Sequence, residues 1–156
     1  MPKPLLLDTN LLLLFVVGET NPDYIAKHKR LQVFDKRDHQ IVRGLIADSA
    51  GLVFCPNVTS ETSNLLRYIH NPLKDFISDK FSDLLGRAEE SYISSAEASR
   101  HQHYTKLGIT DAVLLTLAKT GAVLFTDDLD LYLVATRDGL RAENYNHLRE
   151  ARPDYR

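Results

Sequence analysis

Residues 5–17 read LLLDTNLLLLFVV, an apolar segment that is interrupted only at Asp8, Thr9 and Asn10. A short apolar run that ends in an acidic residue is typical of a parallel strand buried on both faces. Thr9 or Asn10 can cap a helix over the second apolar run, and Gly18 would stop that helix. The segment therefore predicts a strand that passes directly into a buried helix, with Asp8 at the junction.

The rest of the chain continues this alternation of strands and helices. We expect helices over residues 24–34, 40–50, 58–69, 73–87, 109–119 and 129–137, and strands over residues 52–55, 122–125 and 140–145 with a frayed tail after them. Residues 92–106 predict a short strand followed by a polar helix. The pattern indicates an α/β fold with a mainly parallel central sheet. The length of 156 residues, without a linker or repeat, predicts one domain over residues 1–156.

The composition limits the partners of the chain. The formal net charge is −2, so a nucleic acid would have to be held by a local basic surface or through a metal. Cys55 is the only cysteine and lies in an apolar run, which predicts a buried thiol. The acid at residue 8 splits the N-terminal apolar segment, and no run approaches the ~18 residues of a membrane span. We therefore expect a cytoplasmic protein with no membrane partner.

Acidic residues occur where predicted strands end and helices begin. Asp8 follows the first strand, and Asp127 and Asp128 follow the strand over residues 122–125. In an open parallel sheet the carboxyl ends of the strands face one cleft. Glu61 and Asp111 lie near the starts of their helices. Each acid alone also has an ordinary explanation, as a strand exit, a cap or a first-turn acid that favours the helix dipole. Their order and context together predict a cluster.

A cluster of carboxylates is costly, because like charges repel and each group loses hydration. Mg²⁺ or Mn²⁺ relieves that cost, since these cations prefer oxygen ligands. Such a site can polarise a phosphate and generate hydroxide from water. The chemistry that the residues indicate is hydrolysis of a phosphodiester.

Four motifs together resemble the PIN-domain nucleases, a family that includes the toxins of many bacterial toxin–antitoxin pairs. They are DTN at residues 8–10, SETSNLLR at 60–67, GITDAVLLTLA at 108–118 and LFTDDLDL at 124–131. The closing ENYNHLRE at residues 143–150 is similar to the ending of some bacterial members. The resemblance covers residues 5–131, and residues 21–49 look like a variable helical insert. It implies a three-layer α/β/α sandwich and a metal-dependent ribonuclease.

Carried over residue by residue, the resemblance implies four catalytic acids that hold Mg²⁺ or Mn²⁺: Asp8, Glu61, Asp111 and Asp128. The family pattern of a threonine, any residue and then an acid favours Asp128 over its neighbour, although either could face the metal. The resemblance further implies supporting or substrate-contacting roles for five residues: Thr126, Asn10, Asn64, Asp127 and Arg67. Arg67 is the candidate for a phosphate contact, and a solvated helix face is the alternative for it.

The implied activity is that of an endoribonuclease with RNA as substrate. The implied protein partners are an antitoxin and a second copy of the chain. The main alternative is a PIN-like module that binds RNA or protein without cutting. A signalling receiver would need paired acids after the first strand, and a haloacid-dehalogenase-type phosphatase would need an acid at residue 10, where Asn10 stands. Both are disfavoured.

Overall fold

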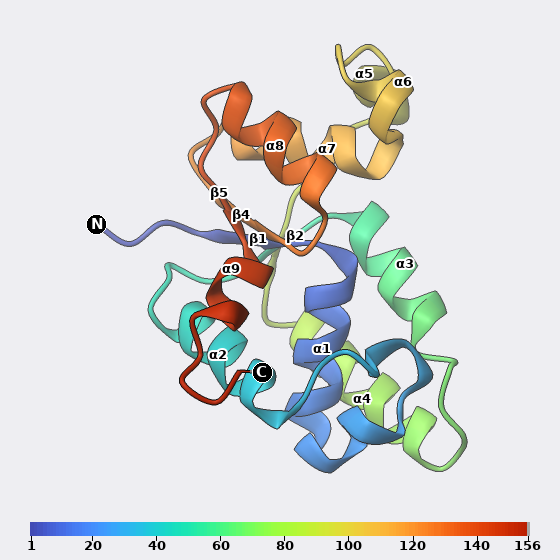
Figure 1. Cartoon of the computed structure of the whole chain (residues 1–156). Helices are drawn as coiled ribbons and strands as arrows, with labels where there is room; N and C mark the ends of the chain where they lie inside the picture. Colours follow the sequence, from blue (N-terminus) through green and yellow to red (C-terminus); the bar gives the residue numbers. More distant parts are fainter. Residues whose placement is uncertain (156) are drawn as a thin grey trace.

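The computed structural model describes residues 1–155 of the chain (Figure 1). In this part of the chain all strand pairs are parallel. The strands are β1 (Leu5–Leu7), β2 (Val53–Phe54), β3 (Glu89–Glu90), β4 (Val123–Thr126) and β5 (Ala142–Asn144). One sheet has the order β1-β4-β5, β2 pairs with β3, and a bridge between Leu5 and Leu52 connects the two. The expected α/β class with a mainly parallel sheet is confirmed.

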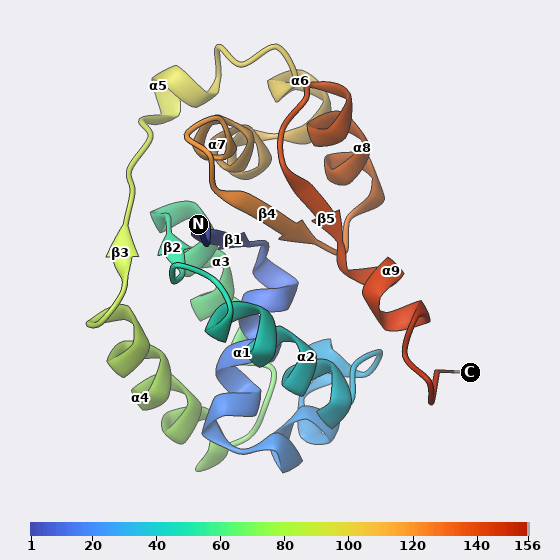
Figure 2. The ribbon, with the colours of Figure 1, turned by 90° about the vertical axis from the view of Figure 1, so that its left-hand side faces the viewer.

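Helices lie on both sides of these strands. Those longer than eight residues are α1 (Thr9–Thr20), α2 (Lys36–Ala47), α3 (Pro56–Leu65), α4 (Leu73–Leu85), α7 (Ile109–Ala118) and α8 (Leu129–Arg137). Shorter ones are α5 (Ser95–Ala98), α6 (Tyr104–Leu107), α9 (Tyr145–Glu150) and the 3-10 helices η1 (Pro22–Lys27) and η2 (Lys29–Leu31). Figures 1 and 2 show α7 and α8 on one side of β1 and β4, and α1, α2 and α4 on the other.

The helix α1 is the centre of the core. Every residue from Leu11 to Gly18 is buried, as an apolar run without a polar face requires. Two details of the prediction are wrong. The cap is Asp8, whose carboxylate accepts a hydrogen bond from the backbone of Leu11, and the helix continues past Gly18 to Thr20. Gly18 therefore lies inside the helix, and its role there is in packing.

Gly18 gives α2 room to approach α1. A Cβ atom at this position would lie 2.2 Å from Cδ2 of His39, a buried side chain of α2. The ring of His39 is also fixed, since its Nε2 lies 2.7 Å from Oε2 of Glu19. The absence of a side chain at residue 18 is therefore a packing requirement of the α1–α2 interface.

Other predictions also differ from the structure. Residues 92–106 contain no strand, since β3 precedes them, and two short helices, α5 and α6, take the place of one polar helix. The helix expected over residues 24–34 is instead η1 and η2, separated by His28, whose buried ring accepts a hydrogen bond from the backbone of Arg30. The expected frayed tail is instead α9. It is anchored by the buried Tyr145, whose hydroxyl donates to Asp38 over 2.6 Å, and by Arg152, which also pairs with Asp38. These anchors come from partners more than a hundred residues away in sequence.

The expected buried thiol is confirmed: Cys55 lies in the core, and burial raises its pKa. Within residues 1–155, no helix has the length and apolar character that a membrane span needs.

The packing at Gly18 gives a stability prediction. We expect Gly18→Ala to lower the free energy of unfolding by about 1–3 kcal/mol, the usual cost of overpacking a core. Gly44→Ala is the matched control, because Gly44 is also helical and a Cβ there meets open space. Alanine should stabilise that helix by roughly 0.5–1 kcal/mol. Urea unfolding of both variants tests this, and stabilisation by both would contradict the packing argument.

Candidate metal centre

The predicted acids come together in a cavity of about 170 Å³ at the carboxyl ends of β1 and β4. These two strands are neighbours, and the chain continues to opposite sides of the sheet from them, where a parallel sheet forms its binding crevice. Five carboxylates line the cavity: Asp8, Glu61, Asp111, Asp127 and Asp128. Within residues 1–155, no lysine, arginine or histidine side chain lines it, so nothing offsets this charge.

The carboxylate of Asp8 is buried at the junction of β1, α1 and β4. Its Oδ1 accepts a hydrogen bond from the backbone of Leu11 over 3.1 Å. Its Oδ2 accepts one from the hydroxyl of Thr126 and one from the backbone of Asp127 over 3.0 Å. Burial, and then the charge of Asp127, raise the pKa of Asp8 well above its usual range, although the Thr126 hydroxyl acts against them. A carboxylate has about four lone-pair positions, so one position on Oδ1 remains free for a cation.

The turn from β4 into α8 supplies two further acids. Asp128 caps α8, because its Oδ1 accepts a hydrogen bond from the backbone of Leu131 over 3.2 Å. Asp127 is half-buried, and its Oδ2 accepts one from Asn10 over 3.3 Å. The expected supporting roles of Thr126 and Asn10 thus correspond to hydrogen bonds in this structure. Both acids line the cavity, so each has access to a bound cation.

Glu61 reaches the cavity from α3 and is held by two threonines, neither of which the sequence had indicated as part of the site. The hydroxyl of Thr9 donates to Oε2 over 2.8 Å, and that of Thr110 donates to Oε1 over 2.6 Å. Each threonine directly follows or precedes a predicted acid, in DTN and in GITD. That adjacency was the signal available in the sequence. The two bonds fix Glu61 while leaving its charge intact.

Asp111, in the first turn of α7, is the least compensated acid of the cavity. Within residues 1–155 its carboxylate accepts no hydrogen bond from another side chain or from the backbone. Burial, followed by the charges of Asp128 and Glu61, raises its pKa to about 6. Both of its oxygens are therefore free to bind a cation that would relieve this repulsion.

The donor set fits a hard divalent cation in charge and in chemistry, since every charged group of the cavity is a carboxylate. The side chains are not placed to coordinate an ion directly. In residues 1–155, no three acidic, histidine or cysteine side chains lie close enough together to hold one ion. Binding would require exposed carboxylates, such as those of Glu61 and Asp128, to turn inward.

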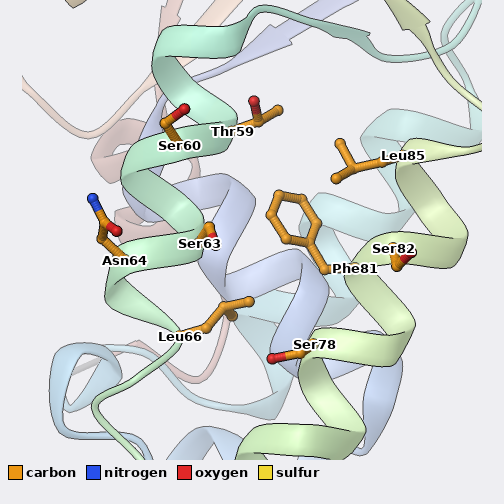
Figure 3. A pocket seen from close by; sticks show the side chains of 9 residues that line it. All are labelled: Thr59, Ser60, Ser63, Asn64, Leu66, Ser78, Phe81, Ser82 and Leu85. Carbon is orange, nitrogen blue, oxygen red and sulfur yellow. The ribbon is translucent and has the colours of Figure 1, made fainter.

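The structure does not bring Asn64 and Arg67 into this cavity. Asn64 is exposed one turn beyond Glu61 and lines a separate cavity of about 450 Å³ between α3 and α4. Figure 3 shows its side chain turned away from Phe81 in that cavity. Arg67 lies beyond the end of α3, where it lines a small cleft with Lys27 and Lys29.

Comparisons with known proteins give no family for the chain. No protein-family model matches it, and no curated protein matches it. A solved structure, described as a domain of a functionally unknown protein from Methanocaldococcus jannaschii, is similar at 19% sequence identity, with 91% of this chain and 90% of that chain covered and a TM-score of 0.45. So distant a likeness carries no argument about function.

The raised pKa of Asp111 predicts a dependence of stability on pH. The folded-state pKa of about 6 exceeds the ordinary value of 3.8, so the ionised group destabilises the fold above pH 6, and this cost is lost as the pH falls toward 4. At pH 7.5 without metal we expect Asp111→Asn to stabilise the protein by about 1–2 kcal/mol, after allowance for solvent screening. This corresponds to a rise in Tm of roughly 3–6 °C. The gain in stability should become smaller as the pH is lowered from 7.5 to 5.

The control for this measurement is Asp75→Asn, because Asp75 is an exposed acid in the first turn of α4. Loss of its charge should lower the free energy of unfolding by a few tenths of a kcal/mol at both pH values. Calorimetry in EDTA measures all three proteins. Equal behaviour of the two variants would mean that Asp111 is an ordinary first-turn residue.

Proposed function

We propose that the chain is a divalent-metal-dependent endoribonuclease of the PIN-domain type. The observation that carries this proposal is the set of five carboxylates around one cavity. Among residues 1–155, no cationic side chain lines this cavity, and no group donates a hydrogen bond to Asp111. Acids without such a function are more often dispersed, because their mutual repulsion and desolvation oppose folding. The motifs that resemble PIN-domain nucleases supply the choice of RNA as substrate.

Under this proposal Asp8, Glu61, Asp111 and Asp128 hold Mg²⁺ or Mn²⁺. When bound, the ion supplies Lewis-acid activation of a phosphate and of water. Asp111 can offer both oxygens, Asp8 one position on Oδ1, and Asp128 its Oδ2, which is free of the cap bond. Glu61 completes the set after rotation away from one of its two threonine partners.

The other residues of the cavity position these acids. Thr126 fixes Asp8 and, through its hydroxyl oxygen, also accepts a hydrogen bond from the backbone of Asp128 over 2.9 Å. Asn10 orients Asp127. The cavity of about 170 Å³ has room for a cation together with a phosphate group, so the scissile phosphate would enter it.

We further propose the finer features that the resemblance implies. These are a three-layer α/β/α sandwich, a cytoplasmic location, and a role as the toxin of a toxin–antitoxin pair with an antitoxin protein and a second copy of the chain as partners. The catalytically silent binding module is the competing function. It is favoured by the finding that no three of the described acids lie close enough to hold an ion as placed.

Cleavage decides between these two functions. We expect the protein to cut a single-stranded RNA oligonucleotide in Mg²⁺ or Mn²⁺ and to stop in EDTA, while a DNA of the same sequence stays intact. Asp111→Asn should reduce the cleavage rate by at least roughly 10–100-fold. Loss of a group that only supports a metal ligand already costs that much at metal sites. Asp111 suits this test because, within residues 1–155, its carboxylate accepts no hydrogen bond that the substitution would break. Asp75→Asn should cut at the wild-type rate. RNA binding without metal-dependent cleavage would identify the silent module.

A second experiment separates the tandem acids. We expect Asp128→Asn to slow cleavage far more than Asp127→Asn, since the threonine-spacer-acid pattern assigns residue 128 to the metal. Asparagine is the right replacement because it retains the cap of α8 and an acceptor for Asn10. Kinetics under single-turnover conditions with saturating Mn²⁺ measure both. Equal losses would assign both carboxylates to the ion, and the reverse order would assign the role to Asp127.

A further inference from the structure

A second charged surface lies at the far end of α3 from the acidic cavity. It consists of Lys27, Lys29 and Arg30 around the η1–η2 junction, with Arg67 and Tyr68 from the segment after α3. We call these five residues the basic surface. All five are exposed, and a cleft of about 120 Å³ opens between the lysines, Arg67 and Tyr68. In Figure 1 the η1–η2 segment lies beside the end of α3 that points away from the strands.

The fold holds this surface together from two distant segments. The backbone of Lys29 donates a hydrogen bond to the carbonyl of Tyr68 over 3.2 Å. The buried ring of His28 fixes the turn, because its Nδ1 accepts from the backbone of Arg30 over 3.1 Å. Burial lowers the pKa of His28, which keeps the ring neutral at this position. Lys27, Lys29 and Arg30 therefore lie on an ordered turn.

The four cations lack acidic partners. Within residues 1–155 none of them forms an ion pair with a carboxylate, whereas Lys36, Arg87 and Arg152 elsewhere do. Three of them line the cleft, and Arg30 lies beside it over the ring of Tyr68. In a protein with a net charge of −2, this group of cations forms a local attraction for phosphate groups.

Tyr68 distinguishes this surface from a simple anion site. Its side chain is 48% exposed, so part of the ring is open to a ligand. The guanidinium of Arg30 lies over the ring, 5.7 Å from its centroid. An exposed ring among cations is the arrangement that binds single-stranded nucleic acids, where bases stack on the ring while phosphates meet the charges. A ring flanked by cations favours a single strand over a lipid headgroup, because a base offers the ring a flat face on which to stack.

The two surfaces are joined by a short stretch of chain. Glu61 on α3 belongs to the acidic cavity, and Arg67 lies six residues further on, after the helix has ended at Leu65. Six residues span at most about 20 Å even when fully extended, so an extended single strand of a few nucleotides can reach from one surface to the other.

We propose that the basic surface is a second RNA-binding subsite, which holds phosphates one to three nucleotides from the scissile bond and stacks one base on Tyr68. This proposal rests on the proposed function for its substrate. It assigns Arg67 a phosphate contact outside the acidic cavity.

Binding without catalysis tests the subsite. Fluorescence anisotropy in EDTA would measure the affinity of the protein for a twelve-nucleotide single-stranded RNA over a range of salt concentrations. We expect Lys29→Ala/Arg67→Ala to weaken binding about tenfold or more and to reduce the slope of log K against log salt by about 1.4, which is two phosphate contacts on a single strand. The control is Lys106→Ala/Arg141→Ala, which removes two exposed cations near α6 and β5 and should leave affinity close to wild type.

The stacking contact has its own variants. Tyr68→Ala should weaken binding about tenfold, and Tyr68→Phe should retain it, because the stacking surface is kept. Against an RNA in which all bases are replaced by abasic sites, Tyr68→Ala should bind as well as wild type. A loss of equal size on the abasic strand would show that Tyr68 supports the fold of the surface and does not stack.

These outcomes separate the subsite from the proposed function. Wild-type affinity and salt slope in Lys29→Ala/Arg67→Ala would overturn the subsite even if the protein cuts RNA. Weaker RNA binding by this variant would support the subsite even if no cleavage is seen, and the nuclease proposal alone would then fail. A variant that loses binding to phosphatidylserine vesicles but keeps RNA affinity would overturn the subsite in favour of a membrane surface.

Discussion

Both the fold and the candidate metal centre depend on the buried carboxylate of Asp8. It caps α1 through the backbone of Leu11 and accepts two hydrogen bonds from the end of β4, from Thr126 and Asp127. A buried carboxylate is tolerated only when such donors replace its lost water. The ends of β1 and β4 are therefore held at a fixed separation by the same group that faces the cavity. Replacement of Asp8 would disturb both, which is why Asp111 reports on the site more clearly.

The remaining acids are held by neutral donors. Threonine hydroxyls bind Glu61, and the amide of Asn10 binds Asp127. A hydroxyl or an amide fixes the position of a carboxylate without cancelling its charge, whereas a lysine or arginine would do both. This distinction explains how the cavity can be ordered and still strongly negative. Asp111 has neither kind of partner within residues 1–155. Burial and the neighbouring charges therefore raise its pKa to about 6.

The sequence is informative where local signals coincide. The helix over Leu129–Arg137 was predicted with its observed ends, because an acid precedes it and a turn with Gly139 follows it. The gathering of acids in one cavity follows from the rule that parallel strands end at one edge. The sequence could not predict α9, since its anchor is the bond from Tyr145 to Asp38. Nor could helical spacing place Arg67, because α3 ends at Leu65 and the chain turns away.

Under the proposed function, the two charged surfaces would set the order in which metal and RNA bind. Without a metal, five carboxylates repel a phosphate chain, while the basic surface attracts it. At physiological salt the Debye length is about 8 Å, so each surface acts mainly on the phosphates nearest to it. RNA would therefore settle on the basic surface first, and its neighbouring phosphate would enter the cavity more readily once a cation there neutralises part of the carboxylate charge. Metal and RNA should consequently bind with positive coupling at the cavity, and with little coupling at the basic surface.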